Sequence, residues 1–195
     1  GRYLVRSLYF DTADYQAYFE KVTGVNERNK LRIRSYFPTR EEAVFLNVEQ
    51  KRRYGRRIGK LVSRITLDHY DQFMRARTWG TKDDRLLSDF ERLCRSSNLH
   101  PVTVVEYRRE AYKSKDGNSV RISFDHKIRY ARADNLFCPE SQYRNDLGHS
   151  IVMEIKTRRS DIAWLNRLVR DQDLGPEPNS KYVNAINHTQ AAIWF

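Results

Sequence analysis

The chain has 195 residues, and its 36 Lys and Arg against 25 Asp and Glu give a formal net charge of +11. This charge favours a polyanionic partner, such as nucleic acid, a phosphorylated small molecule, polyphosphate or an acidic membrane surface. No apolar run could cross a bilayer, no signal peptide opens the chain, and two distant cysteines argue against disulfides or a zinc site. We therefore expect a single cytoplasmic domain, residues 1–195, without a transmembrane segment.

The first half of the chain alternates between strand and helix patterns. A strand is predicted over 2–10, then a helix over 11–24 that is capped by Asp11 or Thr12 and ends at Gly24. Alternating polarity predicts three further strands, and amphipathic spacing two helices, the first capped by Asp68. The strands lie over 30–37, 46–53 and 59–67, and the helices over 69–77 and 83–97.

The second half adds three strands and two helices. Strands over 103–112 and 119–131 flank an Asp116–Gly117 turn, and another strand covers 150–158. A helix over 160–175, capped by Ser160 or Asp161 and ended by Gly175, precedes a last helix over 184–195. The short connections make the strands antiparallel. We expect an α+β fold with one large antiparallel sheet, closed or nearly closed into a barrel.

Ionisable residues recur at every second position of these strands. Successive side chains of a strand point to opposite faces, so Lys30, Arg32 and Arg34 share one face, with Leu31 and Ile33 on the other. The same partition places these further residues on charged faces: Glu49, Lys51, Lys60, Arg64, Arg109, Arg121, Asp125, Glu154 and Lys156.

Two interpretations of the charged face are open. Each strand alone is typical of a half-exposed sheet whose charges meet water. Taken together, the dominance of Arg and Lys and the apolar stripes of the helices favour helices outside and charges inside. Such an interior is stable only if it is hydrated and binds a polyanion, because like charges repel strongly in low dielectric. Arg suits phosphate because its planar fork binds oxygen atoms in pairs.

Two carboxylates among the cations point to a metal. Glu49 and Glu154 do not help to bind an anion directly, but carboxylates beside phosphate usually hold a divalent cation. We therefore expect phosphoryl transfer or triphosphate hydrolysis. The sequence shows no Ser-His-Asp or Cys-His set, and phosphoryl transfer needs mainly positioning and charge neutralisation.

Seven motifs in order resemble the VTC-type polyphosphate polymerase domain of the triphosphate tunnel metalloenzymes, the CYTH-like superfamily. They are "SLYFDT" (7–12), "KLRIRSY" (30–36), "VEQKRR" (48–53), "YRREAY" (107–112), "VRISFD" (120–125), "VMEIKTR" (152–158) and "NSKYV" (179–183). The resemblance implies an antiparallel β-barrel of about eight strands, a triphosphate tunnel. It further implies transfer of the terminal phosphate of ATP to a growing polyphosphate chain with Mn²⁺ or Mg²⁺.

The resemblance also implies roles for individual residues. The catalytic grip on the triphosphate and the chain would come from Arg32, Arg34, Lys51, Arg109, Arg121 and Lys156. Phosphate would also be bound by Lys30, Lys60, Arg64, Ser180 and Lys181. Glu154 would hold the metal, with Glu49 as a second candidate. Family members carry a further charged strand before "SLYFDT", and we expect this chain to lack that strand.

Structural alternatives remain for several of these residues. Glu154 is alternatively an ion-pair partner of Arg121 or Arg109, and Glu49 a counter-ion. Asp125 orients a neighbouring Arg in the interpretation that we favour.

Three functions remain open. The first is polyphosphate synthesis from ATP, the second is metal-dependent hydrolysis of an inorganic or nucleoside triphosphate, and the third is a non-catalytic polyphosphate-binding module. Specific nucleic-acid binding is disfavoured, because no helix-turn-helix, basic recognition helix or zinc finger is present.

Overall fold

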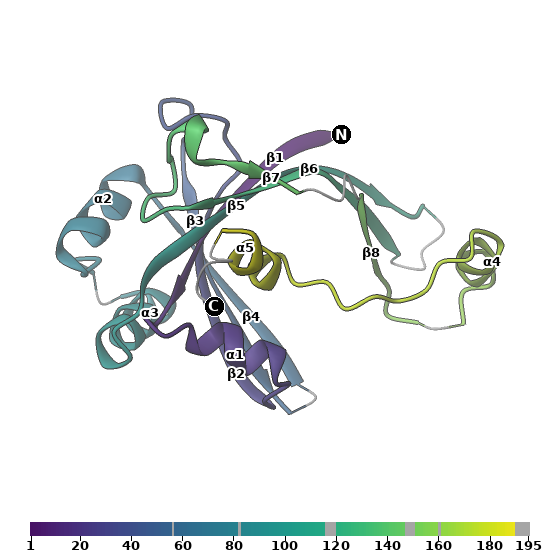
Figure 1. Ribbon diagram of the computed structural model, residues 1–195, viewed down its shortest axis with the longest axis horizontal. Helices are drawn as coiled ribbons and strands as arrows, with labels where there is room; N and C mark the ends of the chain where they lie inside the picture. The colour runs from purple at the N-terminus through teal and green to yellow at the C-terminus, as the bar shows by residue number, and fades with distance from the viewer. Residues whose placement is uncertain (56, 82, 116–119, 147–150, 160, 190–195) are drawn as a thin grey trace.

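One antiparallel sheet dominates the computed structural model, which describes residues 1–55, 57–81, 83–115, 120–146, 151–159 and 161–189 (Figure 1). The strands are β1 (Arg2–Asp11), β2 (Glu27–Ser35), β3 (Leu46–Tyr54), β4 (Arg57–Ile65), β5 (His100–Lys113), β6 (Arg121–Arg132), β7 (Arg144–Asn145) and β8 (Val152–Lys156). The helices are α1 (Gln16–Val22), α2 (Leu67–Ala76), α3 (Arg85–Ser96), α4 (Ala163–Asp171) and α5 (Lys181–Thr189), with a 3₁₀ turn at Glu140–Gln142.

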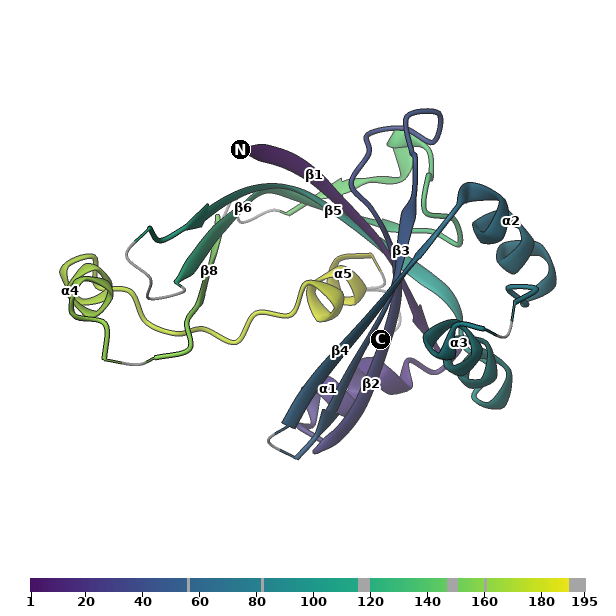
Figure 2. The same ribbon diagram turned by 180° about the vertical axis from the view of Figure 1, so that it is seen from behind.

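The strand order is β4-β3-β2-β1-β5-β6-β7, and β8 pairs with a second stretch of β6. The expected α+β fold around one large antiparallel sheet is confirmed. Closure into a barrel is not observed, because β4 and β8 do not pair with each other in the described residues. Figures 1 and 2 show why: the half containing β2 to β4 diverges from the half containing β6 and β8, and α5 lies between them.

Irregular registers help to curve this sheet. The β1–β5 register shifts between Tyr9 and Phe10, and the β5–β6 register shifts between Glu106 and Arg108. Such bulges increase the local twist of a strand. Lys127 near the second shift has a φ of 51°, a conformation that few non-glycine residues adopt. The curvature gives the sheet a convex and a concave face.

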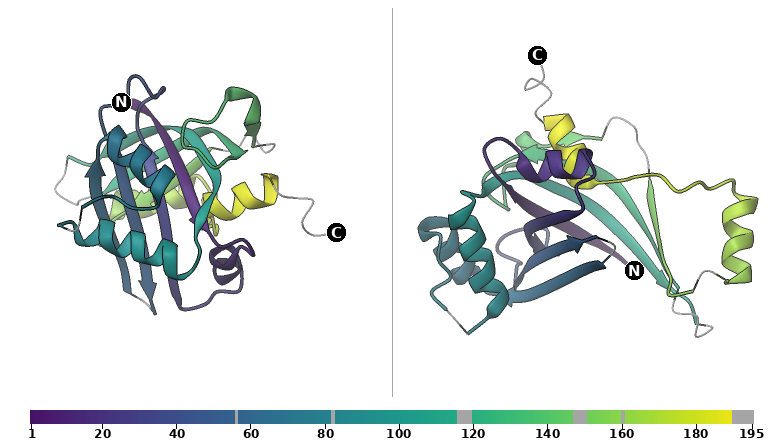
Figure 3. Two further views of the ribbon diagram at one scale, coloured as in Figure 1. Left: turned by 90° about the vertical axis from the view of Figure 1, so that its left-hand side faces the viewer. Right: turned by 90° about the horizontal axis from the view of Figure 1, so that it is seen from below.

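Helices α2 and α3 cover the convex face, as the left view of Figure 3 shows. Leu31 and Ile33, which alternate with the cations of β2, are buried there with Leu8 of β1 against Phe73 and Phe90. An apolar side chain of this size gains roughly 1.5–3 kcal/mol when it is fully buried. The predicted partition of apolar and charged faces therefore fixes the direction in which the cations point.

Helix α5 packs on the concave face rather than outside the sheet. Its residues Tyr182, Ala185 and Ile186 are buried with Tyr9 and Tyr130 of the sheet. Helix α4 lies at the opposite end of the molecule from α2 and α3 (Figure 1), where Leu165 and the N-cap residue Ile162 pack against Ile122 of β6 and Ile155 of β8. The prediction that all helices pack outside was wrong for α5.

Several predicted boundaries need correction. Thr66, not Asp68, caps α2, because its hydroxyl accepts the His69 amide. Helix α4 ends at Asp171 instead of Gly175 and has Ile162 as its N-cap. Helix α5 begins at Lys181, three residues before the predicted start.

Other predictions lie outside the described residues: the Asp116–Gly117 turn, the Ser160 cap and the end of the last helix over 190–195. Among the described helices, none has the length and apolarity needed to cross a bilayer.

Candidate functional site: a cationic cavity

The concave face encloses a cavity of about 620 Å³. Every predicted site residue lines it except Arg64. The charged and hydroxyl-bearing predicted residues in its lining are Lys30, Arg32, Arg34, Glu49, Lys51, Lys60, Arg109, Arg121, Glu154, Lys156, Ser180 and Lys181. Among these described residues, nine are cations and two are carboxylates. The alternating cations of β2 therefore face this cavity, and the more exposed Lys51 and Lys60 of β3 and β4 also line it.

On one wall, Glu49 of β3 is surrounded by cations of β2 and β4. Arg32 Nε and Nη2 donate to Glu49 Oε2 at 2.7 and 2.5 Å. Lys60 Nζ lies 3.1 Å, and Arg34 Nη1 3.6 Å, from Glu49 Oε1, although neither contact has hydrogen-bond geometry. Arg34 Nε instead donates to Ser7 Oγ at 2.9 Å. The contacts favour the counter-ion interpretation of Glu49.

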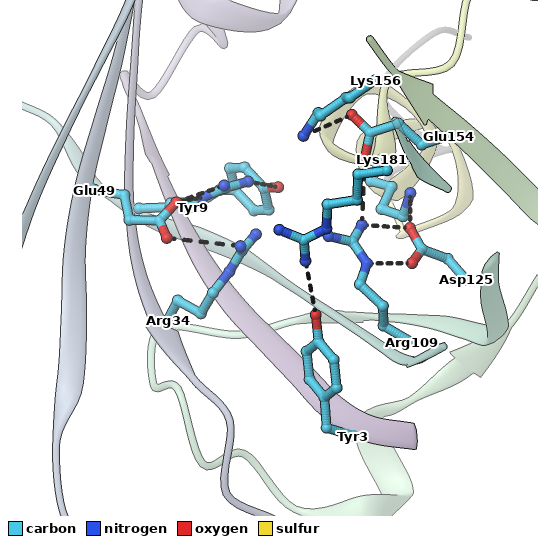
Figure 4. A network of polar contacts seen from close by, with 11 residues as sticks. Tyr3, Tyr9, Arg34, Glu49, Arg109, Asp125, Glu154, Lys156 and Lys181 are labelled. Carbon is cyan, nitrogen blue, oxygen red and sulfur yellow. Dashed lines mark hydrogen bonds and ion pairs between the residues drawn. The ribbon is translucent and has the colours of Figure 1, made fainter. Parts of the chain in front are cut away.

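Figure 4 shows the opposite wall, where Asp125 of β6 holds two cations. Arg109 donates to both carboxylate oxygens of Asp125, at 2.6 and 2.8 Å. Lys181 Nζ at the start of α5 lies 2.7 Å from Asp125 Oδ2. Asp125 is fully buried, so it acts from behind the lining and orients Arg109 and Lys181.

Glu154 of β8 is the more accessible carboxylate. Its side chain is 41% exposed and pairs with Lys156 at 3.0 Å and with Arg109 at 3.7 Å. Arg121 does not pair with it; Arg121 Nη2 donates to Tyr3 Oη at 3.4 Å. The ion-pair alternative for Glu154 is thus realised with Arg109 and Lys156.

Lys51 of β3 has no ion pair or hydrogen bond within the described part of the chain. Lys51 lines the same cavity as Glu154 and Lys156 of β8. The charge of Glu154 raises the pKa of Lys51, and that of Lys156 lowers it. Because it has no described partner, Lys51 is an amine available to a bound anion. Lys30, by contrast, has a partner, since its Nζ lies 3.4 Å from Ser180 Oγ.

The crowding of positive charge shifts several pKa values. Burial, with repulsion from Lys21, Arg28 and Lys51, lowers the pKa of Lys30 to about 8. Burial and repulsion by Arg32 also lower the pKa of Lys51. Burial raises the pKa of Glu49, but Arg32, Arg34 and Lys60 outweigh it and lower that pKa to about 2. A polyanion would relieve this repulsion.

The carboxylates do not form a ready-made metal centre. No group of three or more His, Cys, Asp or Glu residues with suitable placement occurs among the described residues. Glu49 is engaged by three cations, which would repel a metal. Glu154 is exposed, and a single carboxylate suits Mg²⁺, which usually takes its other ligands from water and substrate phosphates. The donor set fits a cation that binds together with a phosphate ligand.

Arg64 is the predicted residue that the structure places elsewhere. It shares a face of β4 with Lys60, but its guanidinium lies 3.9 Å from the centroid of the Phe45 ring. It stands opposite Asn47 in the register, beyond the Glu49 level. The strand pattern gave its face correctly but not its depth along the cavity.

Sequence reasoning missed several lining residues, chiefly tyrosines. Tyr9 accepts a hydrogen bond from Arg32 Nη1 at 3.0 Å, and Arg109 lies 5.2 Å from the Tyr107 ring centroid. The period-two spacing of Ser7 and Tyr9 within "SLYFDT" was a usable signal. The contact between Asp125 and Lys181 could not be found this way, because 56 residues separate the two positions in the sequence.

The comparisons with known proteins agree with this architecture. The family model for the VTC domain matches residues 1–190. A proposed adenylate cyclase of Bacillus halodurans aligns with a TM-score of 0.55 and 13% identity, over 96% of this chain and 82% of that chain. A proposed adenylyl cyclase of Hippeastrum, described as having a dominant triphosphatase activity, aligns with a TM-score of 0.54 and 13% identity. That alignment covers 97% of this chain and 84% of the Hippeastrum chain.

Comparison with curated protein sequences gave no match. At 13% identity the two solved structures show a shared fold and leave the activity open. The match to the family model, by contrast, spans nearly the whole sequence, and all seven motifs lie within the matched residues. The chain therefore belongs to the VTC domain family.

Proposed function

We propose that the chain is a metal-dependent phosphotransferase that moves the terminal phosphate of ATP to a polyphosphate chain inside the cavity. The observation that carries this proposal is the lining itself, in which nine described cations surround two carboxylates. A triphosphate brings about four negative charges at neutral pH, which this surplus would neutralise in a partly buried site where charges are weakly screened.

Each wall would have a separate task. Arg32 and Arg34 are held by Glu49 and Ser7, so they would present fixed donors to phosphate oxygens. Lys51 would move to the charge that develops during transfer, because no described partner holds it. Arg109 and Lys181, positioned by Asp125, would bind from the opposite side. Preorganised charges of this kind lower the barrier without having to reorganise during the reaction.

The transfer breaks the bond between the terminal phosphorus of ATP and its bridging oxygen, and ADP leaves. A terminal oxygen of the polyphosphate chain forms the new bond to that phosphorus. This oxygen is already anionic, so the step needs no general base. Glu154 is the residue that would hold a divalent cation, which supplies charge neutralisation on the phosphates when it is bound.

Triphosphate hydrolysis is the alternative that a specific observation favours. The Hippeastrum protein with the same fold is described as having a dominant triphosphatase activity. The same cations would hold the triphosphate, and water would replace the polyphosphate acceptor. A third possibility, a binding module without turnover, would use the cations alone.

Product analysis separates the three functions. The purified protein is incubated with ATP and Mn²⁺, products are resolved on a polyphosphate gel, and ADP and free phosphate are measured. Polyphosphate ladders that vanish in Lys51→Ala and Glu154→Ala support the polymerase. Free phosphate without ladders supports the hydrolase, and binding without turnover supports the receptor. Arg95→Ala is the matched control, because Arg95 pairs with Glu91 on α3 at 2.8 Å, outside the cavity lining.

A further inference from the structure

Asp11, the last residue of β1, joins three elements through one buried carboxylate. Its side chain is fully buried. Oδ1 accepts the amides of Thr12 and Ala17 at 2.8 and 2.9 Å. Oδ2 accepts the Tyr18 amide at 3.1 Å and the hydroxyl of Tyr182. A capping role at α1 accounts for the amide bonds but not for the bond to α5.

Tyr182, in the first turn of α5, directly follows Ser180 and Lys181, and all three residues line the cavity. Its ring stacks on Tyr9 with centroids 5.2 Å apart, and Lys30 Nζ lies 5.5 Å from its centroid. Lys181 meanwhile reaches Asp125, 2.7 Å away on β6. The first turn of α5 is thus held at two points, by Asp125 through Lys181 and by Asp11 through Tyr182.

The chemistry of this bond favours a defined geometry. Burial, followed by the charge of Asp11, raises the pKa of Tyr182, so the phenol stays protonated and donates. Burying a carboxylate is costly unless it is fully hydrogen-bonded. Asp11 has no ion pair among the described residues, so neutral donors from α1 and α5 must satisfy it. Removing the Tyr182 hydroxyl would therefore loosen α5 where it enters the cavity.

We infer that Asp11 is a positioning residue that acts through Tyr182 to hold Ser180 and Lys181 at the phosphate site. The inference rests on the proposed function, because it assumes that the cavity binds phosphates. Asp11 is not part of the cavity lining, so it would act on a ligand there only through Tyr182. Its predicted effect is on affinity for the phosphate chain.

A double-mutant cycle tests the inference with tripolyphosphate as the probe and calorimetry as the measurement. Tyr182→Phe removes the hydroxyl and keeps the ring on Tyr9, and it is expected to raise the Kd about tenfold, the value of one hydrogen bond to a charged group. Asp11→Asn should act in the same direction. In a Lys181→Ala background, Tyr182→Phe should change the Kd clearly less than in the wild type, because the positioned cation is gone and only the neutral Ser180 remains.

Thr12→Val is the matched control at the same helix. The Thr12 hydroxyl accepts the Gln16 amide at 2.9 Å and has no described hydrogen bond to α5. Its long contact to Asp11 Oδ1, at 3.5 Å, is lost in the variant, but the Thr12 backbone amide still donates to that oxygen at 2.8 Å and the bond from Tyr182 to Asp11 is kept. This variant should lower the melting temperature, as a lost cap does, and leave the Kd unchanged. If Asp11→Asn does not fold, Tyr182→Phe still decides the question.

The inference is overturned if Tyr182→Phe leaves the Kd unchanged, or if its effect is equally large with and without Lys181. It is also overturned if Thr12→Val weakens binding as much as Tyr182→Phe. Wild-type protein that binds no tripolyphosphate would overturn the proposed function together with this inference. Wild-type binding without coupling would overturn the inference alone.

Discussion

Arg32 and Glu49 stand directly opposite each other in the β2–β3 register, and Arg32 Nη2 lies 2.5 Å from Glu49 Oε2. The side chain of Glu49 is only 3% exposed. A cross-strand pair of this kind fixes a guanidinium that would otherwise be mobile and repelled by its neighbours. Glu49 therefore both neutralises part of the charge on this wall and orients Arg32 toward the cavity.

Glu49→Gln should destabilise the protein by about 3 kcal/mol at neutral pH, because the native state lowers the pKa of Glu49 from 4.5 to about 2. Since the native pKa is the lower one, this stabilisation is complete above the ordinary pKa and is lost as the pH falls towards 2. Urea unfolding at pH 7 and pH 3 measures the effect, and the difference between wild type and variant should shrink at pH 3.

The control for this measurement is Asp161→Asn, which breaks an ion pair with Arg159 whose two side chains are 61% and 65% exposed. Such surface pairs contribute little to stability. A Glu49→Gln protein as stable as wild type at pH 7 would show that Glu49 is not the counter-ion that holds this wall.

The alternation of side chains made the main features of the site predictable. Period-two spacing assigned Lys30, Arg32 and Arg34 to one face of β2, and the apolar residues between them required a core on the other. What the pattern could not supply was depth along the cavity. Arg64 shares the charged face of β4, yet its position in the register puts it over Phe45.

Contacts between distant segments were also out of reach. Asp125 could be assigned to a charged face, but its hold on Lys181 depends on where α5 docks. The start of α5 was predicted at Asn184, because "PEPNSKYV" was interpreted as a loop. Lys181 and Tyr182 were therefore not recognised as residues of the first helical turn. Whether the sheet closes could not be predicted for a similar reason. The separation of β4 from β8 depends on twist that accumulates over all the strands of the sheet.

Binding of tripolyphosphate should be accompanied by proton uptake at pH 8. Lys30 has a pKa of about 8, so it is about half protonated there, and a bound polyanion raises its pKa and completes its protonation. We expect Lys30→Met to lower the uptake by about half a proton. Calorimetry in buffers of different ionisation enthalpy measures the difference, and comparison of the two proteins cancels the titration of the ligand itself.

At pH 6.5 the two proteins should agree, because Lys30 is already protonated in the free wild type. Equal uptake by wild type and Lys30→Met at pH 8 would contradict the assignment of the shifted amine to Lys30.

Glu154→Gln should reduce Mn²⁺-dependent turnover about 100-fold, because Glu154 is the exposed carboxylate that fits a metal. Affinity for tripolyphosphate without metal should stay equal or increase, because the variant removes a negative charge from the cavity. Mn²⁺ titrations of turnover and metal-free calorimetry provide the two readouts.

Asp89→Asn serves as the control for Glu154→Gln, since Asp89 pairs with Arg52 at 2.9 Å and lies outside the cavity lining. Mn²⁺ activation that is unchanged in Glu154→Gln would show that a residue other than Glu154 binds the metal. Loss of metal-free affinity would instead indicate that Glu154 acts by positioning Arg109 and Lys156.

Lys51→Ala and Arg64→Ala form a pair that tests the placement of cations on adjacent strands. Lys51 lines the cavity and has no described partner, so its loss should raise the Kd for tripolyphosphate about tenfold at low salt. Arg64→Ala also removes one positive charge, but this charge lies over the Phe45 ring and not in the cavity lining. We therefore expect it to change the Kd less than about twofold. Because salt screens charges, the effect of Lys51→Ala should decrease as ionic strength rises. Equal losses in the two variants, measured by calorimetry, would mean that net charge, rather than the geometry of the cavity, governs phosphate binding.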